Sequence, residues 1–141
     1  MNQILSILTG KQTDESVIDQ GFIGNNQQTA GCFIKTDLVY SICVGTVLAV
    51  ERDVKTATWC VTVEIDSQHW IRYCGLSSAK VAAGDRIEIS TMIGYAYKHL
   101  MKLEYCTSEQ SQFPVRILSR QLYKQDPTII LFSPELLTEV F

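Results

Sequence analysis

Residues 45–74, GTVLAVERDVKTATWCVTVEIDSQHWIRYC, predict a run of paired β-strands. Within this stretch, residues 58–65 alternate strictly between two kinds of side chain. One face carries the larger apolar side chains, which are Trp59, Val61, Val63 and Ile65. An alternation of period two is typical of a half-buried strand. The short polar segments 53–57 and 66–68 predict turns, so the stretch predicts three successive strands, 45–52, 58–66 and 69–74.

Further runs rich in β-branched and aromatic residues lie on both sides of this stretch. They are 32–34, 39–43, 92–96 and 100–106, and they predict strands as well. Residues 80–89, KVAAGDRIEI, predict two short extended pieces around a turn at Gly84-Asp85. We therefore expect an N-terminal arm and loop (1–31), a β domain (32–107) and a C-terminal extension packed on the domain or on a partner (108–141). The extension includes a predicted short helix at 134–140.

The N-terminal arm carries an apolar tip, and two interpretations of it stay open. The tip consists of Ile4, Leu5, Ile7 and Leu8, followed by polar residues 11–20 and a Gly-, Asn- and Gln-rich stretch at 21–31 that predicts a loop. The four apolar residues form either an interface that docks on a neighbouring subunit or a segment that packs back on its own domain.

Composition narrows the classes of function. Hydrophobic residues make up 46% of the 141 residues, whereas charged residues make up only 19%. A low charged fraction favours a protein that buries surface against partner subunits, itself included as a homo-oligomer. The net charge of -3 and the lack of a basic run argue against nucleic-acid binding. We expect no membrane span, because no apolar run approaches the ~20 residues required, and no signal peptide.

The five cysteines are predicted to be buried, reduced thiols. They are Cys32, Cys43, Cys60, Cys74 and Cys106. Their number is odd, most lie in apolar runs, and none forms the close-spaced CxxC pair of a zinc ribbon. This interpretation implies folding in a reducing compartment.

Five short motifs occur in a recognisable order between residues 45 and 106. They are GTV at 45–47, YCGLS at 73–77, VAAGDRI at 81–87, IG at 93–94 and HLMKLE at 99–104. Together they resemble the lysostaphin-type zinc endopeptidases that cut peptidoglycan crossbridges. The resemblance implies a mostly β fold, a small antiparallel β-sandwich, extended here by the N-terminal arm and the C-terminal extension.

The resemblance also implies a zinc site, and this chain departs from it. Active members hold zinc with a His, an Asp and the second His of an H-x-H motif, and two more histidines act on the water and the transition state. Gly75 stands at the position of one catalytic His. When the last motif is aligned on Glu104, Leu100 and Lys102 stand at the two H-x-H positions and His99 falls one residue away, on the opposite face of a strand.

The other register does not restore the site. Aligning His99 with the first His of H-x-H leaves Met101, a soft thioether, as the third ligand. The upstream ligand pair should fall near residues 28–34, which contain neither His nor Asp. We therefore expect no catalytic residue, no metal and no cofactor, and a degenerate groove at Gly75, Leu100, Lys102 and Glu104.

Other candidate constellations have simpler interpretations. Cys74 or Cys106 with His69 or His99 would make a nucleophile pair, but buried thiols and solvated histidines are the preferred interpretation. Glu104 with Arg72 and Lys102 suits either a ligand groove or cross-strand charge pairs. The strand aromatics suit sugar stacking or, preferably, core and interface packing; they are Trp59, Trp70, Tyr73, Tyr95 and Tyr97.

Three hypotheses of function follow from the sequence. The first is a non-catalytic structural component of a bacteriophage tail or baseplate, in the hub or tip region, assembled in the host cytoplasm and located in the virion. Its partners would be other tail and baseplate proteins. The second is a module that binds peptidoglycan or a hydrolase. The third is a cell-wall hydrolase that uses a different site.

Overall fold

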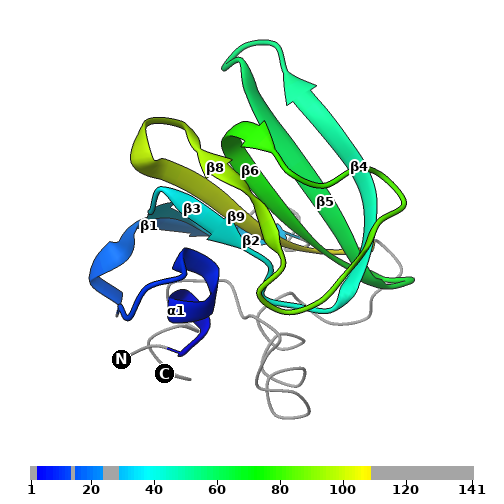
Figure 1. The fold of residues 1–141 in the computed structure, drawn as a ribbon, viewed down its shortest axis with the longest axis horizontal. Helices are drawn as coiled ribbons and strands as arrows, with labels where there is room; N and C mark the ends of the chain where they lie inside the picture. The colour runs from blue at the N-terminus through cyan, green and yellow to red at the C-terminus, as the bar shows by residue number, and fades with distance from the viewer. Residues whose placement is uncertain (1–2, 14, 24–28, 109–141) are drawn as a thin grey trace.

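The computed structural model describes residues 3–13, 15–23 and 29–108 (Figure 1). Within them lie one α-helix, α1 (Gln3–Thr9), and two short 3-10 helices, η1 (Glu15–Val17) and η2 (Tyr97–His99). The strands are β1 (Ile18–Ile23), β2 (Thr29–Lys35), β3 (Leu38–Tyr40), β4 (Gly45–Asp53), β5 (Thr58–Asp66), β6 (His69–Ala79), β7 (Arg86–Ile87), β8 (Met92–Ala96) and β9 (Leu100–Thr107). The predicted C-terminal extension beyond residue 108, with its helix at 134–140, lies outside the described residues.

All nine strands join one hydrogen-bonded sheet, and their pairings are antiparallel. The main path runs β1-β2-β9-β6-β5-β4-β7. Strand β6 forks the sheet: its first half pairs with β9, and from Leu76 onward it pairs with β8, which in turn pairs with β3. The predicted mostly β, antiparallel class is confirmed, with the two layers of the expected sandwich formed by a single forked sheet.

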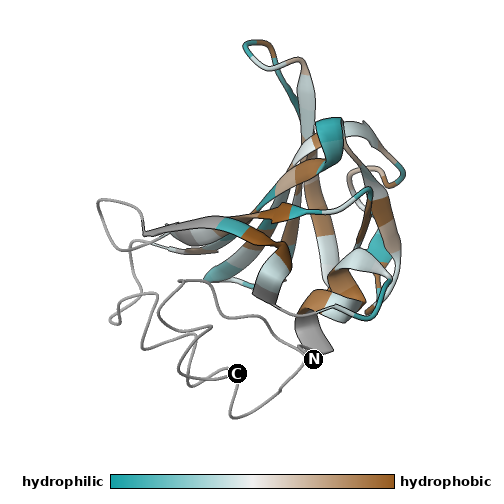
Figure 2. Ribbon diagram, turned by 90° about the vertical axis from the view of Figure 1, so that its left-hand side faces the viewer, coloured by the Kyte–Doolittle hydropathy of each residue, from teal (hydrophilic) through white to brown (hydrophobic). Residues whose placement is uncertain are grey.

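One hydrophobic core fills the space between α1 and the inner face of this sheet. It draws on both branches of the fork, because Val39 in β3 and Ile93 in β8 belong to the same cluster as Ile71 and Tyr73 in β6. Side chains alternate along each strand, so residues next to these core positions face the other way. Figure 2 shows the apolar residues of α1, in brown, beside the strands that they cover. The outer face of β2, β5, β6 and β9 is therefore left for other contacts.

The N-terminal segment belongs to this fold and is not a detached arm. Leu5 and Leu8 of α1 are 2% and 0% exposed within the core cluster, and Ile7 packs against its edge. Of the two interpretations of the apolar tip, packing on its own domain holds for these residues; the side chain of Ile4 is not described. Strand pairing also begins before the expected boundary at residue 32, because β1 pairs with β2 from Ile18 onward. Neighbouring-strand pairing, which local polarity does not reveal, explains the difference.

Two predicted strands are shorter than expected. Strand β3 ends at Tyr40, because the amide of Ser41 turns to donate to Thr91 O at 2.8 Å. In the 80–89 segment only Arg86–Ile87 forms a strand, which pairs with the start of β4. Gly84 does occupy the predicted turn, with φ +94°. Among the described residues, no helix has the length and apolarity needed to cross a lipid bilayer.

Candidate functional site

An open groove of about 760 Å³ lies over the outer face of the sheet. Its floor comes from four adjacent strands and includes Phe33, Thr58, Cys60, Arg72, Cys74, Gly75, Leu100 and Lys102. The β4–β5 hairpin forms one wall with residues 51–53 and Thr56, and Tyr97 and Lys98 of η2 form part of the rim. The hairpin projects well beyond the rest of the sheet (Figure 1). Three of the four residues predicted for a degenerate groove, Gly75, Leu100 and Lys102, therefore meet in one place.

Strand register places these side chains on the groove side. In β9, Met101, Leu103 and Tyr105 are fully buried in the core, so the alternate residues Leu100 and Lys102 face outward. The same alternation in β6 sends Tyr73 inward and its neighbours toward the groove. Pairing of β6 with β9 then sets Arg72 opposite Glu104 and Cys74 opposite Lys102.

Glu104, the fourth predicted residue, lies between two cations. Its carboxylate accepts from Arg72 Nη1 at 2.9 Å and lies 2.8 Å from Lys102 Nζ. Glu104 is only 5% exposed, so its charge is satisfied by these two neighbours and not by water. Of the two sequence interpretations, cross-strand charge pairing describes the arrangement.

Gly75 lies where β6 leaves β9 and joins β8. Its φ is +76°, in the left-handed region that glycine enters at little cost. A Cβ at this position would lie 3.3 Å from Leu100 O and 3.4 Å from Met101 Cα. The position thus serves the fork of the sheet, and any side chain there would be both strained and crowded.

A disulfide between Cys60 and Cys74 joins β5 to β6 on the groove floor. The prediction of five reduced thiols is wrong for this pair. Register explains the difference: between the pairs Trp59–Leu76 and Val61–Tyr73, Cys60 of β5 is opposite a bulge of β6 that contains Cys74. The inference of a reducing compartment, which depended on five free thiols, falls with it.

The other three cysteines are free thiols, as expected. Burial raises the pKa of Cys32 to about 12 and the pKa of Cys43 to about 11. Burial also raises the pKa of Cys106 to about 11. Each of these thiols is protonated at neutral pH, whereas a nucleophilic cysteine is a thiolate. Since Cys74 is bonded to Cys60, neither cysteine proposed for a Cys–His pair is an activated thiolate here.

The two histidines lie outside the groove lining. His99 faces the opposite side of its segment, where its Nδ1 contacts Asp37 Oδ1, and this pair lines a separate, smaller pocket. His69 was predicted to be a solvated turn residue, and that is wrong. Its ring is buried, stacks on Tyr105 with centroids 6.2 Å apart, and places Nδ1 2.7 Å from the Asp66 carboxylate.

Tyr73, the first residue of the YCGLS motif, organises the core beneath the groove. Its hydroxyl is fully buried, accepts from the amide of Ile42 at 3.1 Å and lies 3.4 Å from Ser41 Oγ. Burial raises the pKa of Tyr73 well above its ordinary value. This is a core role, the preferred sequence interpretation. Tyr97, in contrast, is 43% exposed at the groove rim.

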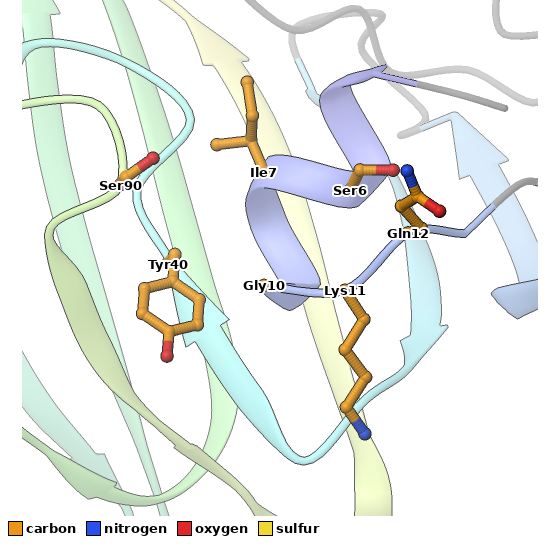
Figure 3. Close-up of a pocket in the computed structure, with 7 residues that line it drawn as sticks. All are labelled: Ser6, Ile7, Gly10, Lys11, Gln12, Tyr40 and Ser90. Atoms are coloured by element: carbon orange, nitrogen blue, oxygen red, sulfur yellow. The ribbon is translucent and has the colours of Figure 1, made fainter.

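A second open pocket of about 670 Å³ lies between α1 and β3 (Figure 3). Ser6, Ile7 and Gly10 come from the helix side, and Tyr40 and Ser90 face them. Of these residues, Ile7 belongs to the apolar tip that the sequence offered as a possible interface. Lys11 and Gln12 complete the lining, so the pocket offers a mixed polar and apolar surface for contact.

Comparison with solved structures shows which known fold this sheet resembles. The chain superimposes on lysostaphin with a TM-score of 0.51 and 17% identity, over 67% of this chain and 45% of that one. It superimposes on LytU with a TM-score of 0.55 and 12% identity, over 83% of this chain and 92% of LytU. The chain has the lysostaphin-type fold. CbpA from L. salivarius REN shares it, with a TM-score of 0.52 and 14% identity over 78% of this chain and 72% of CbpA.

The sequence itself gives no comparable match. No protein-family model matches the chain, and no curated protein matches it. The likeness to the lysostaphin-type fold is therefore one of backbone architecture. The chain also spans less than half the length of lysostaphin.

The groove residues of this lysostaphin-type fold do not fit a catalytic zinc ion. Such a site needs three protein ligands, usually His or carboxylate, and an open position. Gly75 and Leu100 offer no donor atom, Lys102 is a cation, and the Glu104 carboxylate is held by Arg72 and Lys102. Among the described residues, no cluster of three or more His, Cys, Asp or Glu side chains is arranged to hold a metal.

Proposed function

We propose that this chain is a non-catalytic structural component of a bacteriophage tail or baseplate, in the hub or tip region. One observation carries the non-catalytic part of the proposal. The groove positions that resemble the peptidase site hold Gly75, Leu100 and Lys102, and the nearby carboxylate of Glu104 is already neutralised by two cations. Without three free ligands, the groove lacks the means to activate a water molecule.

The assembly part of the proposal draws on the surface. Charged residues are scarce at 19% of the chain, and Leu48, Val54, Tyr95 and Tyr97 are exposed large apolar side chains. Val54, at 89% exposed, lies at the tip of the projecting β4–β5 hairpin. Aromatic and apolar side chains of this kind contribute strongly to subunit interfaces. Lysostaphin-type domains occur in phage tails, where other tail proteins would be the partners of such an interface.

Zinc content tests the non-catalytic part. The full chain is purified without chelators, and zinc per chain is measured by elemental mass spectrometry beside a peptidoglycan zymogram. We expect near-zero zinc and no clearing of the gel. About one zinc per chain, or clearing at the position of the chain, would overturn the proposal and restore a hydrolase that uses a different set of ligands.

Co-expression with the products of neighbouring genes tests the assembly part. We expect a defined complex by native mass spectrometry, and weaker assembly of the hairpin variant Val54→Asp than of the control Ala83→Asp, which changes another exposed position. A chain that stays monomeric and binds none of these products would contradict the structural role.

A peptidoglycan- or hydrolase-binding module is the second candidate. The specific observation in its favour is the open groove with an exposed tyrosine, Tyr97, and Lys98 at its rim. Pull-down on purified cell walls distinguishes it from the first candidate. Retention that is lost in Tyr97→Ala but kept in Tyr95→Ala would support binding in the groove, and no retention would dismiss it for cell walls.

A further inference from the structure

Both cysteines of the Cys60–Cys74 disulfide line the groove floor. Cys74 is partly exposed, whereas Cys60 is 8% exposed. A disulfide that is reached from an open groove is available for exchange with an incoming thiolate. Most structural disulfides, in contrast, lie where solutes do not reach them.

Two cations lie on the Cys74 side of this disulfide, whereas Glu51 is opposite Cys60 in the β4–β5 pairing. Lys102 is directly opposite Cys74 in the β6–β9 pairing, and Arg72, two residues before Cys74, faces the same way. Both side chains line the groove. Neighbouring lysine and arginine stabilise a thiolate. Glu104 offsets one of the two positive charges, so the Cys74 side of the groove keeps a net positive charge that favours an anionic thiol and a Cys74 thiolate.

The remaining cysteines are free thiols outside the groove lining. Cys32 and Cys43 are buried in the core, and burial raises the pKa of each above its usual value. Cys106 is partly exposed, toward the other end of β9; burial and then the Glu104 charge raise its pKa to about 11, although Arg72 and Lys102 lower it. Of the five cysteines, Cys60 and Cys74 are the pair that lines the groove, so a thiol that enters the groove meets this disulfide.

We propose that Cys60 and Cys74 form a thiol–disulfide exchange site that opens into the groove and accepts anionic thiols. A thiolate attacks Sγ of Cys74, the more exposed partner, and the Cys60–Cys74 bond breaks. Cys60 leaves as a thiolate and takes up a proton, which gives a mixed disulfide at Cys74. A second thiol then displaces Cys74 beside Lys102, so that two electrons and two protons pass from two thiols to the protein, and the thiols leave as a disulfide.

Exchange at this site changes the groove and leaves the fold in place. The bond joins β5 to β6 at a bulge, and Cys60 is opposite Glu51 in the hairpin that forms one groove wall. The ladder between β5 and β6 continues beyond the bulge, from Val61 to Asp66, and holds the strands together after reduction. This inference is independent of the proposed tail role, because it uses only the groove surface.

Glutathione, an anionic monothiol, is the probe. The full chain, purified in air, is treated at neutral pH without denaturant, and tryptic peptides are examined by mass spectrometry, in which Cys60 and Cys74 fall in different peptides. We expect the adduct on Cys74 and a free thiol at Cys60. Free Cys60 and Cys74 before treatment, an adduct mainly on Cys60, or reaction only in denaturant would each overturn the proposal.

Charge dependence tests the role of the cations. We expect Lys102→Gln to slow glutathione exchange by about threefold or more, while Lys35→Gln, an exposed lysine on the neighbouring strand β2, leaves the rate unchanged. In the unmodified chain, rising salt should slow glutathione more than neutral 2-mercaptoethanol, because salt screens the attraction. Equal rates for the two variants, together with equal salt dependence of the two thiols, would remove the cations from the mechanism.

Discussion

Arg72 and Glu104 face each other across the β6–β9 pair, with Arg72 Nη1 2.9 Å from Glu104 Oε2. Lys102 completes the cluster from the same strand as Glu104, at 2.8 Å. In a lysostaphin-type fold this face would carry the zinc chemistry. Here the three charges satisfy one another, so the groove floor is held by an internal ion-pair cluster.

Removing the carboxylate from this cluster should destabilise the chain. In Glu104→Gln, Arg72 and Lys102 are left as two neighbouring cations without a counter-charge. Breaking a fully buried ion pair costs about 3–5 kcal/mol. Because both cations are more than a third exposed, solvent offsets part of this cost, and we expect a loss of about 1–2 kcal/mol.

Urea unfolding measures this loss, with Glu88→Gln as the matched control. Glu88 is exposed, so its substitution should change stability by less than about 0.5 kcal/mol. A double-mutant cycle with Arg72→Gln isolates the coupling between the two side chains. A Glu104→Gln chain as stable as the parent would show that the cluster adds no stability.

Removing the Tyr73 hydroxyl should cost stability through the backbone amide of Ile42. That amide donates to the hydroxyl at 3.1 Å inside the core. In Tyr73→Phe the donor is left buried without this partner, which costs about 1–3 kcal/mol. Thermal unfolding provides the measurement, and Tyr97→Phe, at an exposed position, should leave the midpoint nearly unchanged. Equal midpoints for the two variants would contradict the assignment.

A side chain at Gly75 should disturb the fork of the sheet. Gly75→Ala places a Cβ in the left-handed region, at about 1–2 kcal/mol, and 3.3 Å from Leu100 O. Gly84→Ala is the comparison, because Gly84 also has positive φ but no atom lies within 4 Å of its Cβ position. We expect Gly75→Ala to unfold at a lower urea concentration than Gly84→Ala. A lower midpoint for Gly84→Ala would show that the backbone at the fork shifts to relieve the crowding.

The strands and part of the groove could be predicted from sequence because they follow local patterns. The alternation at 58–65 placed Val61 and Val63 in the core, where the structure has them. Leu100 and Lys102 were expected to share a groove with Gly75 because the motif order resembled that of a known fold. These are properties of one strand, or of a fixed order of strands.

The remaining features depend on how distant strands meet. The Cys60–Cys74 bond lies at a bulge in β6, which no local pattern marks. Burial of His69 depends on Tyr105, 36 positions along the chain, in a different strand. The residues of β1 include too few apolar side chains for the sequence to predict a strand there. The strand is recognised only by its pairing with β2. Cross-strand register was the missing information in all three cases.

The Asp37–His99 contact holds the η2 segment that forms the groove rim. Lys98 and His99 both have positive φ, at 54° and 63°, which is unfavourable for residues other than glycine. Two backbone hydrogen bonds tie this segment to the turn after β2: Thr36 N donates to His99 O at 3.0 Å, and Ala96 N donates to Asp37 O at 2.9 Å. The side-chain pair adds a third tie that responds to pH.

The stabilising effect of Asp37 should disappear in acid. The hydrogen bond from His99 holds the pKa of Asp37 below its ordinary 3.8, so the unfolded chain takes up this proton first as the pH falls. The contribution of Asp37 is therefore complete above its unfolded pKa and is lost as the pH falls through the lower, folded value. Asp37→Asn should be less stable than the parent near pH 6, and the difference should vanish near pH 2. Urea midpoints across this range, repeated in a His99→Gln background, provide the test: a difference that persists unchanged at pH 2, or that survives without His99, would contradict the pairing.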